Sequence, residues 1–479
     1  MKNLKDVYFG CADADTEANR RPEVFQEVFF DPLNHLRELI HGERFIVRGR
    51  KGDGKTAYGA KINLMKDETN VKPSQRSLND FDNSVFEKIR TYENLGGNPY
   101  ISFWKCVVII ECFKMIDHYQ PHIATQEFTD LRDALSRHGL LKSGNAISST
   151  IKRLVETDTT VSVKSFSHGR RSEHTETLHG AEEIYSAICR TIKNLYLDRD
   201  RFMLIIDGFD DILHHTKFDA KIITGLIRAA KEINEIFLKT TLSLKAILLI
   251  RNDILDLCRD PNLSKILRDS EIHLAWTIES DLENSNLIQL VKKRFNYAWG
   301  TNESFVDIWK EFFVEYANEK PSLEYALENI IYRPRDILQF FDEAQKVYRP
   351  GQVISFESLK RVLLNYSKDY FVVEMKDELT GFFPDDVVTT LPDILSSLGS
   401  RHFFLHEFDA ECKKYPAFKD IPARAILERL FNGGYIGQYK PRGVSTYAVF
   451  SYRHEREKFV DEHECILHRG LMRAFNLIS

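Results

Sequence analysis

The expected fold of this chain starts from residues 45–56, which read FIVRGRKGDGKT. Phe45-Ile-Val is a short apolar strand, and a helical pattern begins at Lys55 and continues to Met65. Between strand and helix, residues 49–56 satisfy the GxxxxGK[ST] pattern of a phosphate-binding loop in full. Glycines permit positive φ, so successive N–H groups can point toward one phosphate, and the helix adds its positive N-terminal end. A chance glycine turn also fits the letters, but the strand–loop–helix order favours the phosphate loop.

Each position of this loop is a candidate contact for a nucleotide. Lys55 can reach the β- and γ-phosphates, and the Thr56 hydroxyl can bind Mg²⁺. The candidate cofactor-binding residues of the loop are Gly49, Arg50, Lys51, Gly52, Asp53, Gly54, Lys55, Thr56 and Ala57.

A second apolar strand, Phe202 to Ile206, ends in Asp207. Ligands of open α/β sheets bind outside the carboxyl ends of the strands, which makes Asp207 the candidate partner of Thr56 in holding Mg²⁺. Asp210 or Asp211 could orient the attacking water, and the residues alone do not choose between them. The alternative is that Asp207 only caps a helix. The phosphate loop upstream favours the magnesium role.

Two arginines follow as candidate sensors of the nucleotide. Arg251 comes directly after the apolar strand 246–250, so it can reach the γ-phosphate; Asn252 could instead hold the water, or this could be a capping turn. Arg335 lies in the first turn of a helix that begins near Pro334, where a cation opposes the helix dipole. Contact with a phosphate would explain that position, and so would an ion pair with Asp336 or Asp342.

Strands that alternate with helices indicate a parallel α/β sheet, with further strands at 246–250 and 272–276. Residues 66–83 carry loop signals, and 157–179 are expected to form a strand pair or an exposed excursion. We expect a P-loop core over residues 1–278 with an insertion at about 84–180, a helical lid over 279–350, and a helical and winged-helix-like domain over 351–479.

The winged-helix expectation rests on a helix at Ala425–Phe431, a strand from Tyr435, a basic turn and a strand from Tyr447. Lys440 and Arg442 in that turn could touch a phosphate backbone. Residues 401–479 carry 13 Lys and Arg against 10 Asp and Glu, a small excess that favours a protein-contact module.

The amino-acid composition excludes some classes of function. The net charge of −5, from 66 Lys and Arg and 71 Asp and Glu, excludes a generic polycation that coats nucleic acid. The seven cysteines form no CxxC pair, which is typical of a reducing compartment. No apolar stretch is long enough to span a bilayer, and the first residues lack a signal-peptide pattern. These features predict a cytoplasmic protein without a membrane partner.

The order of the segments resembles that of bacterial P-loop ATPases related to the STAND and AAA+ groups, many of them encoded in phage-defence neighbourhoods. The shared segments are Phe9–Glu17, the loop, IIDGFDD at 205–211, LLIRND at 248–253, Leu274–Trp276, RPRDI at 333–337 and His468–Phe475.

The resemblance implies ATP and Mg²⁺ as cofactors and Asp210 or Asp211 as the catalytic acid. It implies that Phe9 and Gly10 seat the adenine and that Arg251 and Arg335 act as sensors. It also implies a regulatory switch in antiviral defence that controls a protein effector or its own oligomeric assembly. The alternatives are a DNA-loading ATPase that uses the winged helix, and a small-molecule kinase, for which no acceptor site is visible.

Overall fold

The computed structural model describes residues 2–67, 69–78, 99–141, 147–156, 160–166, 173–179, 181–197, 199–209, 220–276, 281–442, 445–454 and 457–477. The chain forms two compact units. The sheet unit comprises Leu33–Gly49 and Lys55–Leu274, and the C-terminal unit comprises Met1–Pro32, Arg50–Gly54 and Ala275–Ser479. The first 32 residues therefore fold with the C-terminal half of the chain.

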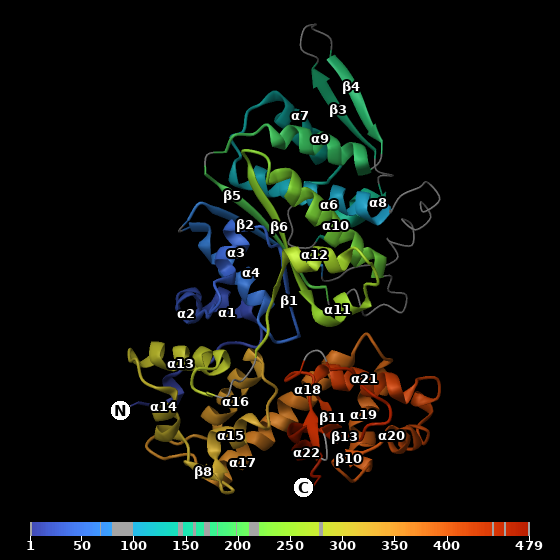
Figure 1. Cartoon of the computed structure of the whole chain (residues 1–479). Helices are drawn as coiled ribbons and strands as arrows, with labels where there is room; N and C mark the ends of the chain where they lie inside the picture. The colour runs from blue at the N-terminus through green and yellow to red at the C-terminus, as the bar shows by residue number, and fades with distance from the viewer. Residues whose placement is uncertain are drawn as a thin grey trace. The chain divides into compact units, whose positions relative to one another are not determined.

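A five-stranded parallel sheet with the order β2-β5-β6-β1-β7 organises the sheet unit (Figure 1). Its strands are β1 (Ile46–Gly49), β2 (Val71–Ser77), β5 (Arg201–Asp207), β6 (Ser243–Arg251) and β7 (Glu271–His273). This confirms the predicted α/β class and its parallel sheet. Strand β6 lies between β1 and β5, and the register sets Gly49 of β1 beside Arg251 of β6.

One strand was missed by the sequence patterns. Residues 71–77 were expected to lie in a loop, yet Val71–Ser77 pairs in parallel with β5 from Val71 beside Arg201 to Ser77 beside Asp207. As an edge strand, β2 pairs on one side only and can carry polar residues and Pro73. Its sequence therefore lacks the apolar run of the central strands.

Helices cover the sheet of this unit. Strand β5 is buried from Phe202 to Ile206, as expected of a parallel strand covered on both faces. Figure 1 shows α3 and α4 on one side of the sheet and α6, α9 and α10 on the other. The helices are α3 (His35–His41), α4 (Lys55–Leu64), α6 (Pro99–Tyr119), α7 (Gln126–Arg137), α8 (Ser148–Glu156), α9 (Ala181–Lys193), α10 (Ala220–Phe237), α11 (Asn252–Leu257) and α12 (Leu263–Ser270), with a 3₁₀ turn at Met65–Asp67.

The expected strand pair within 157–179 is confirmed as an antiparallel hairpin of β3 (Thr160–Phe166) and β4 (Glu173–His179). No helix among the described residues is both long enough and apolar enough to cross a bilayer.

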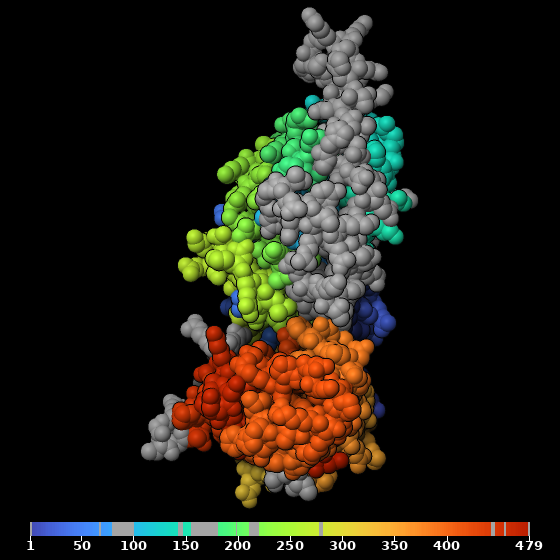
Figure 2. All heavy atoms as spheres, turned by 90° about the vertical axis from the view of Figure 1, so that its right-hand side faces the viewer, coloured from blue at the N-terminus to red at the C-terminus, as the bar shows by residue number. Residues whose placement is uncertain are grey.

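The C-terminal unit is mostly helical, with an aromatic core around Phe295 and Phe341. Its helices are α1 (Ala14–Arg20), α2 (Pro22–Val28), α13 (Asn286–Trp299), α14 (Phe305–Phe312), α15 (Ser322–Leu327), α16 (Pro334–Val347), α17 (Phe356–Asn365), α18 (Val372–Leu379), α19 (Asp385–Ser397), α20 (Leu405–Cys412), α21 (Ala423–Gly433) and α22 (Arg469–Ala474), with short turns at Leu4–Asp6, Tyr366–Phe371 and Pro416–Phe418. Figure 2 shows the orange-coloured atoms of this unit gathered on one face.

This unit also contains strands. The segment 279–350, expected to form a helical lid, also holds a small antiparallel pair of β8 (Tyr316–Ala317) and β9 (Lys320–Pro321). Farther on, an antiparallel sheet has the order β10-β13-β11-β12, from β10 (His402–Phe403), β11 (Ile436–Arg442), β12 (Ser445–Val449) and β13 (Cys465–Leu467). The succession α21, β11, β12 has the predicted order of helix, strand and strand. Lys440 and Arg442, which were expected in the turn, instead lie in β11, where they pair with Tyr447 and Ser445 of β12.

Candidate phosphate-loop site

The loop between β1 and α4 has the backbone that its glycines predict. Gly52 has φ +86° and Gly54 has φ +93°, a region that residues with a Cβ rarely adopt. A Cβ on Gly54 would meet no atom within 4 Å, so this position needs glycine for its backbone conformation alone. Ala57 follows in the first turn of α4.

Asp53 closes the loop onto itself. Its Oδ2 accepts a hydrogen bond from the Arg50 backbone N–H at 2.6 Å and lies 3.6 Å from the Arg50 Nε. The side chain is 1% exposed, and Trp276 donates its indole N–H to the Asp53 carbonyl at 3.0 Å. Asp53 therefore shapes the loop, although its carboxylate would repel a phosphate if it faced one.

In the sheet unit, the two predicted magnesium ligands lie together. The Thr56 hydroxyl donates to Asp207 Oδ2 at 2.8 Å across 151 residues of sequence. The other carboxylate oxygen, Oδ1, accepts the Gly208 N–H at 2.8 Å. Lys55 is 8% exposed and its Nζ donates to the Gly49 carbonyl at 3.2 Å. A hydroxyl and a carboxylate in contact at the carboxyl edge of the sheet are oxygens of the kind that Mg²⁺ selects, so these residues fit the ion that the motif implies.

At the end of β6, Arg251 is held by a neighbouring acid. It is 7% exposed and donates from Nε and Nη2 to Asp253 at 2.9 and 2.5 Å. Arg251 is the residue that precedes α11, and its side chain makes no capping hydrogen bond there. The first turn is instead bound by Asp253, whose Oδ1 accepts the Ile254 N–H at 3.0 Å. Asn252 accepts a hydrogen bond from Arg48 at 3.1 Å. The two candidate catalytic acids, Asp210 and Asp211, lie outside the described residues.

In the C-terminal unit, Arg333 makes contacts that the sequence analysis missed. Its guanidinium is fully buried and donates to the Lys51 carbonyl at 3.1 Å, to Asp336 Oδ2 at 2.7 Å and to Glu378 Oε1 at 2.5 Å. The hydroxyl of Tyr366 donates to the second Asp336 oxygen at 2.6 Å. The only signal in the sequence was the i,i+3 spacing of Arg333 and Asp336 around Pro334.

Arg335, the predicted second sensor, pairs with an acid that sequence spacing did not suggest. Its Nη1 lies 3.4 Å from Glu374 of α18, whereas Asp336 pairs with Arg333 and Asp342 with Lys346. Lys51 shares Glu374 at 3.4 Å. The Arg335 backbone N–H also donates to the Gly52 carbonyl at 3.4 Å. Loop residues and the start of α16 are therefore in direct contact within this unit.

The predicted adenine seat is part of a packed core. Phe9 is 4% exposed and stacks on Phe341 with ring centroids 5.1 Å apart. Gly10 has φ +102°, and a Cβ there would lie 2.5 Å from a carboxylate oxygen of Glu17. Glu17 in turn forms a buried ion pair with Arg294 at 2.8 Å. The ring of Phe9 is thus fully used by protein contacts, and its role at a base stays a prediction.

Comparisons with known proteins include a family match, a curated relative and a solved structure. Residues 285–372 match the family described as the FunZ-associated C-terminal helical domain. The chain is 22% identical over 479 residues to the "Putative transposon gamma-delta 80.3 kDa protein" of Escherichia coli strain K12, over 95% of this chain and 65% of that protein. It therefore spans about two thirds of the length of that relative. A crystal structure of Cdc6p from Pyrobaculum aerophilum aligns with 90% of this chain and 89% of that one, with 13% identity and a TM-score of 0.24.

Proposed function

We propose that the chain is an ATPase that binds ATP with Mg²⁺ on the loop Gly49–Thr56. The hydrogen bond between Thr56 and Asp207 carries this proposal, because it joins the end of the loop motif to the acid at the end of β5. When bound, Mg²⁺ would neutralise charge on the β- and γ-phosphates. Thr56 and Asp207 would hold the ion, and Lys55 would leave the Gly49 carbonyl to contact phosphate.

The remaining roles follow from the resemblance and the positions of the residues. Arg251, at the end of β6 between the strand of the loop and the strand of Asp207, would sense the γ-phosphate. Asp210 or Asp211 would orient the attacking water. Arg335 would act from the first turn of α16, after release from Glu374. Phe9 would support the Gly10 backbone at the base.

We propose further that ATP binding and slow hydrolysis act as a regulatory switch in an antiviral defence system, controlling an effector protein or the chain's own assembly. The contacts of the loop support a switch. Lys51 and Gly52 touch Arg333, Arg335 and Glu374, so a change in the loop backbone would reach α16 and α18 directly. The defence setting rests on the resemblance in motif order.

Nucleotide turnover by the purified chain tests the first proposal. We expect Lys55→Ala and Asp207→Ala to abolish release of inorganic phosphate, while Lys61→Ala, six residues farther along α4, leaves it within twofold. Equal turnover in all four proteins would refute the assignment. Measuring ATP binding alongside distinguishes a chain that binds without hydrolysing from one that does not bind.

A DNA-loading ATPase that uses the winged-helix-like segment is the alternative function, and it can be tested separately. The matched relative is named as a transposon protein, and α21, β11 and β12 have a winged-helix-like order. The structure gives this alternative less support at Lys440, which forms an ion pair with Glu457 and donates to the Lys458 carbonyl at 3.3 Å. DNA-stimulated turnover that is lost in Lys440→Ala with Arg442→Ala would favour it over the effector switch.

A further inference from the structure

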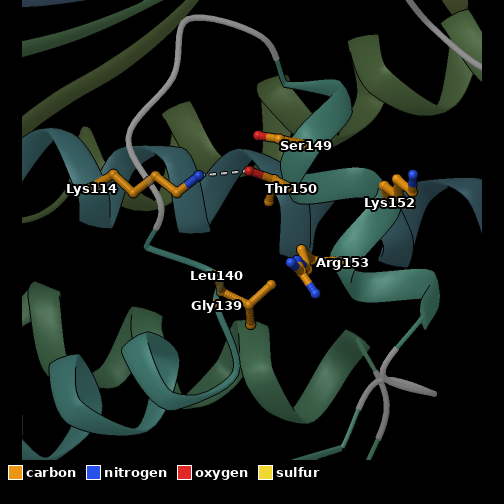
Figure 3. A pocket seen from close by; sticks show the side chains of 7 residues that line it. All are labelled: Lys114, Gly139, Leu140, Ser149, Thr150, Lys152 and Arg153. Carbon is orange, nitrogen blue, oxygen red and sulfur yellow. Dashed lines mark hydrogen bonds between the residues drawn. The ribbon is translucent and has the colours of Figure 1, made fainter.

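Charged side chains of this chain are bound to their partners with different strength. Figure 3 shows a tightly bound cluster at a small pocket of the sheet unit, where Lys114 donates to the Thr150 hydroxyl at 2.6 Å. The same ammonium donates at 2.7 Å to Glu111, which is 1% exposed. Charge-assisted hydrogen bonds of about 2.7–2.9 Å are strong, so these groups are committed to one another.

Two cations beside the phosphate loop are bound more loosely, and both to the same acid. The Arg335 Nη1 lies 3.4 Å from each carboxylate oxygen of Glu374, and the Lys51 Nζ lies 3.4 Å from the Glu374 Oε2. The three side chains keep contact with solvent, at 18% exposed for Lys51, 28% for Arg335 and 13% for Glu374. Because ion pairs of this length and exposure contribute little, another anion can replace the carboxylate at small cost.

A neighbouring arginine keeps this acid in place. Arg333 is fully buried and donates to Glu378 of α18 at 2.5 Å and to Asp336 of α16 at 2.7 Å. These bonds hold α18 at the start of α16 through an acid other than Glu374. Glu374 therefore stays near Arg335 when its own ion pairs are broken.

Both loosely held cations are anchored at the loop backbone. Lys51 is a residue of the loop, and the Arg335 N–H donates to the Gly52 carbonyl at 3.4 Å. A Cβ on Gly52 would lie 3.3 Å from the Arg335 Cβ, so the loop packs against the first turn of α16. The long side chains of Lys51 and Arg335 can thus turn from Glu374 toward a phosphate held by the N–H groups of the loop.

We propose that Glu374 is an autoinhibitory residue that competes with the phosphates of ATP for Lys51 and Arg335. A carboxylate and a phosphate accept the same charge-assisted hydrogen bonds from a guanidinium or an ammonium. When ATP binds, the two cations exchange the Glu374 carboxylate for phosphate oxygens, and breaking the two ion pairs lowers the affinity for the nucleotide. This regulation rests on the proposed function, because it requires that the loop binds ATP.

Calorimetric titration of the full chain with Mg²⁺ and the non-hydrolysable analogue AMP-PNP tests the competition. Glu374→Gln keeps the shape of the side chain and removes its charge, and should tighten binding by about fivefold or more. Glu374→Ala is a second variant with the same expected direction. A merely structural role of Glu374 would weaken binding instead.

The same helix offers a matched control. Asp377 lies 3.6 Å from Lys51 and is 55% exposed, so Asp377→Asn removes the same charge from a pair that solvent screens. It should change the affinity for AMP-PNP by about twofold or less. A background of Lys51→Met with Arg335→Met removes the cations for which Glu374 competes, and there Glu374→Gln should also have an effect of about twofold or less.

The inference and the proposed function can fail separately. AMP-PNP binding that both Glu374 variants leave unchanged or weaken would overturn the competition. An equal gain in the background without Lys51 and Arg335 would overturn it too, because Glu374 would then act only by general repulsion. In either case the proposed function stands if binding is lost in Lys55→Ala. Absence of AMP-PNP binding in wild type and in both Glu374 variants would refute the proposed function, and this inference with it.

Discussion

Replacing Arg333 with methionine is the sharpest test of how the C-terminal unit supports the loop. The substitution keeps much of the side-chain volume but removes a guanidinium that contacts Asp336, Glu378 and the Lys51 carbonyl. The buried carboxylates of Asp336 and Glu378 then each lose an ion-pair partner. Breaking a buried pair in this way costs about 3–5 kcal/mol. Urea unfolding followed by tryptophan fluorescence should show that loss relative to wild type.

A control and a rescue make the reasoning specific. Arg335→Met removes a cation that is 28% exposed and 3.4 Å from Glu374, and should cost less than about 1 kcal/mol. Adding Asp336→Asn and Glu378→Gln to Arg333→Met removes the two carboxylate charges that faced the guanidinium and should recover most of the lost stability.

In the triple variant, the affinity for ATP should not recover together with the stability. The rescued triple variant still lacks the hydrogen bond to the Lys51 carbonyl, so its ATP affinity should stay about fivefold below wild type, equivalent to about 1 kcal/mol. An Arg333→Met chain within about 1 kcal/mol of wild-type stability would refute the buried-network argument. Full recovery of ATP affinity in the triple variant would refute the link to the loop.

Three further predictions follow from the site and the core. Thr56→Val should weaken ATP binding at least tenfold with Mg²⁺ and less than twofold without it, whereas Thr56→Ser should retain binding; equal losses in both conditions would contradict a metal role. Gly54→Ala and Gly300→Ala both place a Cβ at positive φ with no neighbour within 4 Å, so each should cost about 1–2 kcal/mol in urea unfolding, but only the first should weaken ATP binding. Burial, with nearby Arg453 and Arg401, holds the pKa of His468 well below its usual range, so the unfolded state binds the extra proton as pH falls below about 6.5. Stability should then drop by up to about 1.4 kcal/mol per pH unit in urea titrations at pH 8, 6.5 and 5, with a shallower drop in His468→Asn; identical slopes would refute it.

The residues alone predicted the sheet, its parallel sense and the loop conformation. The apolar runs ending at Gly49, Asp207 and Arg251 are each a local pattern, because a strand buried on both faces must be apolar along its length. Parallel strands bring their carboxyl ends to one edge of the sheet. The sequence alone therefore predicted that Asp207, at the end of its strand, would lie near Thr56. The roles of these residues in catalysis stay predictions.

The pairing of strand β2 and the partners of Arg333 depend on the tertiary structure and could not be predicted from local sequence patterns. Val71–Ser77 is a strand only because β5 offers it an edge to pair with, and nothing in its polar sequence shows that partner. Nothing in the sequence distinguishes Arg333 from a surface arginine. In the folded chain it is buried in contact with Glu378, 45 residues away, and with the Lys51 carbonyl of the loop, 282 residues away. Periodicity reports which side of an element is buried, whereas the partner of a buried charge depends on which distant elements the fold brings into contact.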